Sequence, residues 1–380
     1  MTSKERVQAA IARKPVDRVP LGFYAVDCDT VARVIGRPTY VRNKIAIHVA
    51  LWEGRRDEVA ESLKKDTVEF YRKLDCADII LPKEAPVIPP KSYVPPLMKK
   101  LSETEWQDPK GSVFRASPMT NEIQIVYTPP EPPREYTVEE FEKPLEFKEP
   151  DPSVFEVFDY VYDHLGGERY ICAPAHATAM TLLGGTENGL LMYAMQPDVV
   201  MAASRQACAA QNASDSSRIR KGAPGALIEQ DLAGTNAPLL SPKMFREMCL
   251  PFLTERVRRI KQFVPQVVLH NCGNNFALME MLIEAGIDGY QSLQTTAGME
   301  IGKLKRMYGG NLCFWGGVPV ELLVAGTPDE VRKATRQAME AGAPGGGFIL
   351  GPSHSIAYGT KYENFMAMVD EFVRLRNKVY

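Results

Sequence analysis

The chain has 380 residues, of which 45% are hydrophobic and 24% are charged, and its formal net charge at pH 7 is -2. This length suffices for one large domain with a substantial core. The near-neutral charge gives no support for nucleic acid or an anionic membrane as a partner, and favours a small substrate or a protein partner.

The N-terminal stretch, MTSKERVQAAIARKP, predicts a polar amphipathic helix without the apolar core of a secretory signal. No apolar run reaches the roughly 18 residues that a membrane span needs. Seven cysteines are scattered singly along the chain, which favours reduced thiols over a disulfide framework. We therefore expect a cytoplasmic protein that is not associated with a membrane.

Eight short apolar runs have the length of strands and alternate with longer helical patterns. Each run is apolar throughout, as expected for parallel strands that are covered on both faces. This alternation predicts a closed (β/α)8 TIM barrel of the α/β class, with an open doubly wound sheet as the competing arrangement. The runs are 19–24, 77–81, 170–175, 226–231, 267–270, 289–293, 312–316 and 347–350.

Two of the intervening helices carry clear start signals. The segment 241–263 begins with Ser241 as a cap, followed by a first-turn proline. The segment 327–342 begins with Thr327 as a cap, continues with a proline and two acids, and ends at a glycine.

The interval from about 83 to 160 interrupts the alternation of strands and helices. It is rich in proline and contains a predicted β-hairpin in SVFRASPMTNEIQIVYT, residues 112–128. We expect one barrel domain over residues 1–380, with this interval as an inserted excursion. The excursion is either a lid or an oligomer contact, or a surface loop without a catalytic part.

His270 and Cys272 end the fifth apolar run, in QVVLHNCGNN. Because side chains alternate along an extended chain, both residues point to the same face. Imidazole nitrogen and thiolate sulfur suit Zn²⁺, which takes three protein ligands and keeps an open position when it is catalytic. The alternative is a buried histidine beside a structural cysteine. A third candidate ligand is His354, just past the eighth run, where barrel loops carry active sites.

Four stretches together resemble the uroporphyrinogen decarboxylase superfamily, and within it the zinc-dependent methyltransferases such as methylcobalamin:coenzyme M methyltransferases. They are DLAGTNAPLLSPKMFREMCLPF, LHNCGNN, AGIDGYQSLQTTAGMEIGKLKRMYGGNLCFWGGV and GGGFILGPSHSIAYGTKYENFMAMV. The resemblance implies a (β/α)8 barrel, zinc bound by the H-x-C pair and a later residue, and a corrinoid (cobalamin) on a separate partner protein. In those methyltransferases the later ligand is a Cys in a loop resembling APGCG. This chain has GPSHS, so His354 falls in the Cys position.

The exchange of Cys for His changes the charge that the ligands leave on zinc. Two thiolates and one neutral imidazole leave a net charge near zero, which keeps a bound thiolate nucleophilic. One thiolate and two imidazoles leave about +1, which makes a stronger Lewis acid. We therefore expect methyl transfer from a small methylated donor, such as a methyl ether, to the cobalt of a corrinoid protein.

Three alternative functions remain open at this point. They are a methylcobalamin:thiol methyltransferase, a metal-free decarboxylase-like enzyme, and a non-catalytic binding or assembly subunit; a homodimer is compatible with all of them. The decarboxylases have an arginine-rich segment resembling RQAGRY after the first strand, whereas this chain has LGFYAVDCDT. We expect Asp27 and Asp29 in this segment to repel a tetra-acid substrate.

Six further residues are candidates for the site. Asp231 and Glu229 share a face at the end of the fourth run, and each is either a base, a further zinc ligand or partner of a histidine, or an anchor for a loop. Four residues at or near strand ends are candidates for the substrate pocket: Tyr24, His176, Gln294 and Trp315. For His176 and Trp315 the alternatives are a structural histidine and a core tryptophan.

Overall fold

Seven parallel strands form the central sheet of the computed structural model, which describes residues 1–132, 134–220 and 222–378. Their order in the sheet follows their order in the chain, and each overlaps a predicted apolar run. The strands are β1 (Ile79–Ile80), β6 (Tyr170–Pro174), β7 (Gly225–Glu229), β8 (Val267–His270), β9 (Gly289–Gln291), β10 (Cys313–Val318) and β11 (Phe348–Pro352).

The segment 19–24 closes the ring between β11 and β1, but it is not a regular strand, so the prediction of a full first strand is wrong. Leu21 forms an isolated parallel bridge with Leu350, whose N–H donates to the carbonyl of Pro20 at 2.9 Å. On the other side, the N–H of Asp78 donates to the carbonyl of Leu21 at 2.8 Å. Pro20 has no N–H to donate, and the N–H of Leu21 donates to the Asp78 carboxylate at 2.9 Å. The fold is therefore a (β/α)8 barrel whose first strand is reduced to a bridge.

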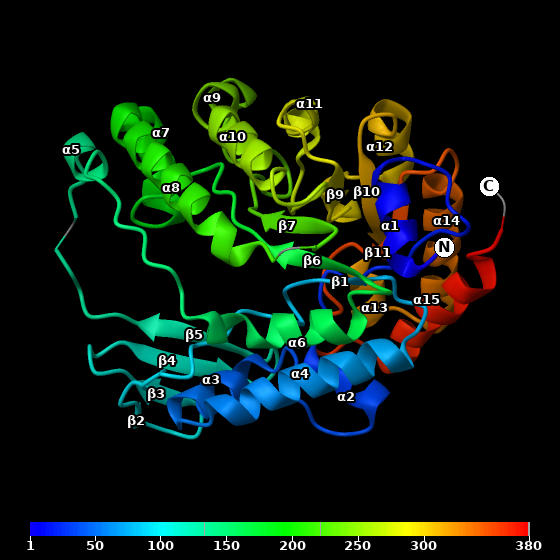
Figure 1. Cartoon of the computed structure of the whole chain (residues 1–380), viewed down its shortest axis with the longest axis horizontal. Helices are drawn as coiled ribbons and strands as arrows, with labels where there is room; N and C mark the ends of the chain where they lie inside the picture. The colour runs from blue at the N-terminus through cyan, green and yellow to red at the C-terminus, as the bar shows by residue number, and fades with distance from the viewer. Residues whose placement is uncertain (133, 221, 379–380) are drawn as a thin grey trace.

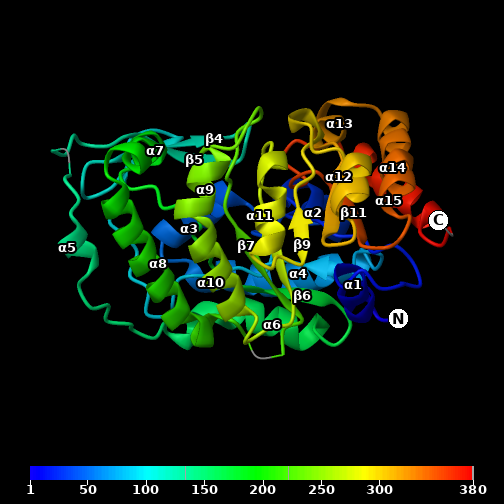
Figure 2. The same ribbon diagram turned by 90° about the horizontal axis from the view of Figure 1, so that it is seen from above.

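Helices surround this sheet (Figures 1 and 2). None of the helices in the described ranges is long and apolar enough to cross a membrane. The helices are α1 (Ser3–Ile11), α2 (Cys28–Ile35), α3 (Lys44–Trp52), α4 (Arg56–Lys73), α5 (Val138–Phe141), α6 (Glu156–Leu165), α7 (Thr186–Met195), α8 (Pro197–Arg218), α9 (Pro242–Met248), α10 (Leu250–Ile260), α11 (Met279–Glu284), α12 (Ile301–Tyr308), α13 (Val320–Ala325), α14 (Pro328–Gly342) and α15 (Tyr362–Leu375), with 3-10 turns at Pro152–Phe155, Phe276–Leu278 and Thr295–Ala297.

The two predicted helix starts are confirmed, and one predicted helix is divided. Ser241 caps α9 by accepting a hydrogen bond from the N–H of Met244. The helix is interrupted at Cys249, because Pro251 in the first turn of α10 cannot donate a backbone hydrogen bond. Thr327 and Glu330 form a reciprocal capping box at the start of α14.

Alternate residues of the strands fill the interior of the barrel, in a buried apolar cluster that also contains Trp315. Helix α1 contributes apolar residues to this cluster and covers the N-terminal end of the barrel. Its Lys4 N–H donates to the carbonyl of Glu168, and its Gln8 carbonyl accepts from the side chain of Gln266. Both partners precede barrel strands, so the opposite face, at the C-terminal strand ends, is the one available for a site.

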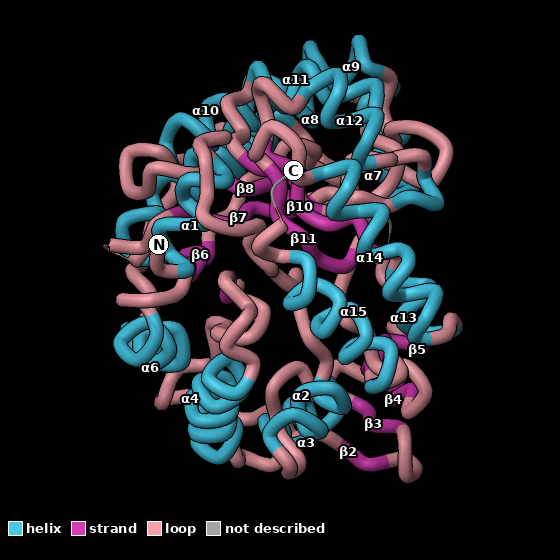
Figure 3. Tube along the Cα trace, turned by 90° about the vertical axis from the view of Figure 1, so that its right-hand side faces the viewer, coloured by secondary structure: helices cyan, strands magenta, loops and turns pink. Residues whose placement is uncertain are grey.

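The excursion forms a second, antiparallel sheet. Its strands are β2 (Lys99–Lys100), β3 (Glu105–Gln107), β4 (Val113–Ser117) and β5 (Glu122–Tyr127). The predicted hairpin is confirmed as the β4–β5 pair. This sheet lies apart from the barrel strands, with β5 beside α3 (Figures 1 and 3). The chain then crosses to α5, which packs against α8.

Replacing Asp78 tests whether its carboxylate stabilises the closure of the barrel. Its fully buried carboxylate pairs with Arg6 at 2.8 Å and Arg18 at 3.0 Å, and it also accepts the N–H of Leu21. We expect Asp78→Asn to lower the free energy of unfolding by about 3–5 kcal/mol, because two guanidinium groups lose a buried counter-charge. Thermal unfolding followed by circular dichroism measures this as a lower midpoint.

The matched control is Glu103→Gln, which removes a carboxylate whose side chain is 93% exposed and pairs with Lys100. No measurable change is expected there, because exposed ion pairs contribute little. Equal unfolding midpoints for the two variants would contradict the closing role of Asp78.

Candidate metal centre

The C-terminal ends of β7, β8 and β9 place three polar side chains in one row. Glu229 is the register partner of His270, and His270 is the register partner of Gln291. Register partners in a parallel sheet point to the same face. His270 is therefore flanked on both sides by polar groups, although only 4% of its surface is exposed.

Cys272 lies in the loop after β8 and turns toward the same site as His270. Its Sγ is 3.4 Å from Nε2 of His270, so the prediction that the two side chains share a face is confirmed. The loop is fixed by its backbone: the N–H of Cys272 donates to Oδ1 of Asp231 at 2.8 Å, and the N–H of Gly273 donates to Oε1 of Gln294 at 2.9 Å.

His354 reaches the site from the loop after β11. One ligand atom from each of His270, Cys272 and His354 lies within 4.8 Å of the others. His354 is the most exposed of the three residues, and its ring centroid is 5.3 Å from that of His270. The structure thus brings together the three residues that the sequence identifies as candidate ligands.

The separation of His270 and Cys272 matches that of two ligands of one zinc ion. Zinc binds histidine nitrogen at about 2.0–2.1 Å and cysteine sulfur at about 2.3 Å, so a tetrahedral site separates nitrogen and sulfur ligands by roughly 3.5 Å. The observed separation of Nε2 of His270 and Sγ of Cys272 is 3.4 Å. Mixed imidazole and thiolate donors also match the chemical preference of zinc.

The end of β9 and the turn after it hold both candidate ligands of the H-x-C pair, and sequence reasoning missed this role. Oε1 of Gln291 contacts Nδ1 of His270, and Oγ of Ser292 lies 3.3 Å from Sγ of Cys272. Ser292 also donates to the carbonyl of Ser353 at 2.8 Å, next to His354. Predicting these contacts would have required aligning β9 with β8 in register.

Ser292 has a left-handed backbone, with φ of +87°, although it is not a glycine and is fully buried. Such a conformation is costly and persists where the surroundings impose it, often at functional sites. Here the imposed conformation places one hydroxyl between the loops that carry Cys272 and His354.

Tyr24 forms a wall of the site. Its ring stacks on that of His270 with centroids 3.7 Å apart and an interplanar angle of 9°, and it meets His354 edge-on at 5.3 Å. The hydroxyl donates to Oε2 of Glu229 at 2.5 Å. Burial and the adjacent Glu229 raise the pKa of Tyr24, so the hydroxyl keeps its proton.

Glu229, which the sequence predicts as a base, a further zinc ligand or an anchor, accepts hydrogen bonds on both carboxylate oxygens. One oxygen accepts from Tyr24 and the other accepts from Lys83 at 2.7 Å. Although burial raises the pKa of Glu229, the hydrogen bonds from Lys83 and Tyr24 lower it below its usual value. Glu229 is therefore an ionised anchor for Tyr24. Lys83 is a further site residue that the sequence did not reveal.

Asp231 stays a candidate for direct chemistry. Oδ1 accepts the N–H of Cys272, while the residue is exposed at the open face of the barrel. In the described part of the chain its carboxylate is not among the clustered ligand atoms. It orients the loop of Cys272, and its part as a base stays a prediction.

The remaining predicted pocket residues have structural partners. The ring Nε2 of His176 contacts Arg218 at 3.0 Å, and its carbonyl accepts from Arg256. Trp315 is 1% exposed in the barrel core, and its Nε1 donates to a backbone carbonyl. Gln294 supports the loop of Cys272. Trp315 is thus core rather than pocket wall, while His176 is exposed and its part in substrate binding stays a prediction.

Asp27 and Asp29 also have structural roles, and their repulsion of an acidic substrate stays a prediction. Asp27 is 3% exposed, pairs with Arg42 at 2.9 Å and accepts the N–H of Tyr358. Asp29 accepts the N–H of Gly359 at 2.7 Å. Both acids anchor the loop that follows His354.

Burial sets the protonation of the three candidate ligands. It lowers the pKa of His270 to about 4, lowers that of His354, and raises the pKa of the Cys272 thiol to about 11. Near neutral pH both imidazoles are uncharged, while the cysteine is protonated until a cation replaces its proton.

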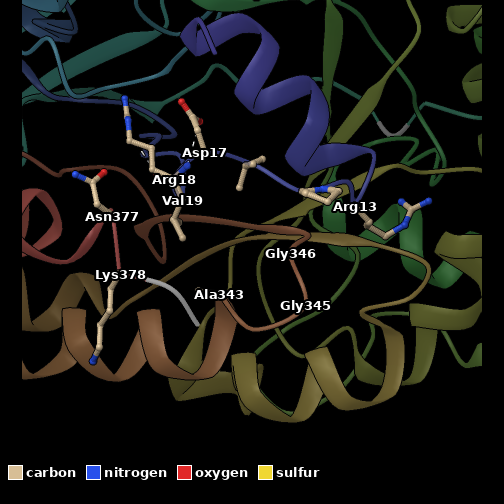
Figure 4. A pocket seen from close by; sticks show the side chains of 11 residues that line it. Arg13, Asp17, Arg18, Val19, Ala343, Gly345, Gly346, Asn377 and Lys378 are labelled. Atoms are coloured by element: carbon tan, nitrogen blue, oxygen red, sulfur yellow. Dashed lines mark hydrogen bonds between the residues drawn. The ribbon is translucent and has the colours of Figure 1, made fainter.

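A separate cavity of about 440 Å³ lies at the other end of the barrel (Figure 4). Arg13, Asp17 and Arg18 line one side of it, and Gly345 and Gly346 line another. The two guanidinium groups point in different directions (Figure 4). Because TIM-barrel active sites lie at the C-terminal strand ends, we assign this cavity no part in the chemistry.

Comparison with known proteins agrees with this architecture. The sequence profile of the family described as Uroporphyrinogen decarboxylase (URO-D) matches residues 121–375. A solved structure, a methyltransferase from Methanosarcina mazei, aligns with a TM-score of 0.63 at 18% sequence identity, covering 99% of each chain. At this identity the likeness establishes a shared fold. No curated protein sequence matches the chain significantly.

The protonation states predict how metal binding depends on pH. Binding of Zn²⁺ near pH 7.5 should release about one proton per site, because Cys272 must ionise while His270 and His354 are already neutral. The logarithm of the affinity should rise by about one per pH unit above neutral pH and up to the thiol pKa of about 11, because only Cys272 changes its protonation in this range. Isothermal titration calorimetry in buffers of different ionisation enthalpy counts the protons. Release of none would contradict the assignment.

Proposed function

The chain belongs to the uroporphyrinogen decarboxylase family, and from that premise we propose that it is a zinc-dependent methyltransferase of a corrinoid system. It would move a methyl group from a small methylated donor, such as a methyl ether, to the cobalt of a corrinoid protein. The observation that carries this proposal is the convergence of His270, Cys272 and His354 within 4.8 Å at the open end of the barrel.

The donor set supports an ether as the methyl donor. When bound, Zn²⁺ held by one thiolate and two neutral imidazoles retains a charge of about +1 and supplies Lewis acidity toward the donor oxygen, which favours release of an alkoxide or phenolate. Burial keeps His270 neutral, and the same cause acts on His354.

The side chains around the three ligands orient the reactants. Tyr24 holds the plane of the His270 ring and presents a mostly apolar wall to the methyl donor. Glu229 and Lys83 hold the hydroxyl of Tyr24 in place. Asp231 lies at the open rim, where it can accept a proton or orient a donor.

The open face supports a protein partner as the methyl acceptor. Glu229, Asp231 and His354 are exposed residues beside the buried His270. A group carried on another protein must approach to bonding distance, which an exposed rim allows. That the structural neighbour from Methanosarcina mazei is a methyltransferase also supports this proposal.

The charges around the site count against the metal-free decarboxylase alternative. A site for a polycarboxylate substrate needs cations that are free to pair with it. Here Lys83 pairs with Glu229, and Arg42 pairs with Asp27. Both cations are already neutralised by the protein.

Elemental analysis tests the ligand set. We expect about one zinc per chain in the wild type, and its loss in Cys272→Ala and His354→Ala, because three protein ligands are the minimum for such a site. His176→Ala is the matched control and should retain its zinc, since His176 lies outside the ligand cluster. An unchanged zinc content in His354→Ala would contradict the proposed ligand set.

Activity tests the reaction. The zinc-loaded protein should transfer methyl from at least one member of a panel of methyl ethers to a reduced corrinoid protein, and Cys272→Ala should be slower by more than about 100-fold, the upper range for loss of a mere supporting residue. Transfer is measured by the absorbance of the methylated corrinoid. A fully zinc-loaded protein that is inactive across the panel would contradict the proposal.

His354→Cys tests the charge argument. A second thiolate would lower the net charge of the zinc site from about +1 to near zero. We expect slower ether demethylation and faster methyl transfer to a thiol, with the ratio of the two rates shifting by about tenfold or more. Zinc content must stay equal to the wild type for the comparison to count. An unchanged ratio of the two rates would refute the charge argument but not the zinc site itself.

A further inference from the structure

We propose that Gln291 is a positioning residue that fixes the tautomer of His270, with the proton on Nδ1 and the lone pair on Nε2. This inference deepens the proposed function, because only that tautomer can bind a metal through the nitrogen that faces Cys272. No sequence motif marks Gln291, and the proposal comes from its contacts in the structure.

A neutral imidazole has two ring nitrogens and one proton. Whichever nitrogen holds the proton is a donor, and the other is an acceptor or a metal ligand. His270 has its Nε2 directed at Cys272, 3.4 Å from Sγ, and its Nδ1 directed at Gln291. The partner of Nδ1 therefore decides whether Nε2 is free to bind a metal.

Gln291 faces Nδ1 with its carbonyl oxygen, which can only accept a hydrogen bond. This contact requires the proton to be on Nδ1. The reverse orientation of the amide would present an NH₂ group, which donates, and would move the proton to Nε2. The orientation of the Gln291 amide thus selects the tautomer of His270. With the NH₂ group toward Nδ1, the proton would be on Nε2 and would block metal binding there.

The ring of His270 cannot avoid this selection by rotating. Tyr24 stacks on one face of the imidazole at 3.7 Å and fixes its plane. The strand register between β8 and β9 fixes the two residues side by side. His270 and Gln291 are 4% and 0% exposed, so water is not an alternative partner for Nδ1.

The other end of the amide makes no comparable contact. Its buried Nε2 has no hydrogen-bond partner among the residues that the structure describes. A buried donor without a partner is costly, and an apolar side chain of similar shape would avoid that cost. Packing alone therefore does not account for a glutamine at position 291, whereas the contact of its oxygen with Nδ1 of His270 does.

The tautomer can be measured directly in the metal-free protein by long-range ¹H–¹⁵N NMR with ¹⁵N-labelled histidine. The chain has five histidines, and the signals of His270 are assigned by their absence in His270→Asn. The wild type should show the proton on Nδ1. Gln291→Glu, which offers only acceptor oxygens, should keep it there, whereas Gln291→Leu should populate the tautomer with the proton on Nε2.

Gln294→Leu is the matched control, because it changes a glutamine three residues further along the chain that contacts a backbone N–H rather than the imidazole. It should leave the tautomer of His270 unchanged. A change of tautomer in this control equal to that in Gln291→Leu would overturn the proposal, because the effect would then come from general loosening of the turn.

Zinc affinity gives the second readout. Gln291→Leu should weaken binding by about 10–100-fold, the range for loss of a partner of a ligating histidine, while Gln291→Glu should bind as well as the wild type or better. If Gln291→Leu fails to fold, the tautomer and affinity of Gln291→Glu still test the claim, and loss of the Nδ1 proton there would refute it.

The two proposals fail in different ways. A wild-type protein that binds no zinc would refute the proposed function, while the NMR result would still decide the role of Gln291. A wild-type protein with its proton on Nε2 in the metal-free state would refute the role of Gln291, whatever the zinc content.

Discussion

The parallel register of β7, β8 and β9 is the constraint on which the site depends. It places Glu229, His270 and Gln291 side by side, so that one imidazole lies between a charged network and a neutral amide. Tyr24, from the segment that closes the ring, stacks on the same imidazole. A shift of one residue in any of these strands would turn its side chains to the other face. The strand pairings that close the barrel therefore also position the residues of the site.

The alternation of apolar runs and helical patterns is sufficient to predict the barrel, because strands covered on both faces must be apolar throughout. The exceptions are confined to short segments, and each has an identifiable cause. Leu21 bridges rather than forming a full strand, because Pro20 lacks an N–H and Asp78 takes the N–H of Leu21 with its side chain. The predicted helix after Ser241 is divided, because Pro251 interrupts its hydrogen bonds. Asp78 lies far from Leu21 in sequence, so this exception could not be predicted from the segment itself.

The ligand cluster could be predicted because it follows from rules that act along the chain. The spacing of His270 and Cys272 places both on one face, and a histidine just after the last strand lies at the C-terminal end of the barrel. The supporting residues follow from contacts across the sheet. Whether Glu229 is a free base or an anchored carboxylate depends on Tyr24 and Lys83, which are distant in sequence and reach it only in the folded chain.

The three candidate ligands differ in how firmly the fold holds them. His270 and Cys272 are fixed by strand register, by backbone hydrogen bonds and by the turn after β9. His354 is more exposed and stands on a loop whose anchors, Asp27 and Asp29, hold the backbone beyond it rather than its ring. A change of donor at position 354 therefore alters the charge of the site while leaving the buried pair in place. Chemical variation is least costly at this position, because Ser292 and the two acids hold the backbone on either side of His354, while the ring itself is the most exposed of the three.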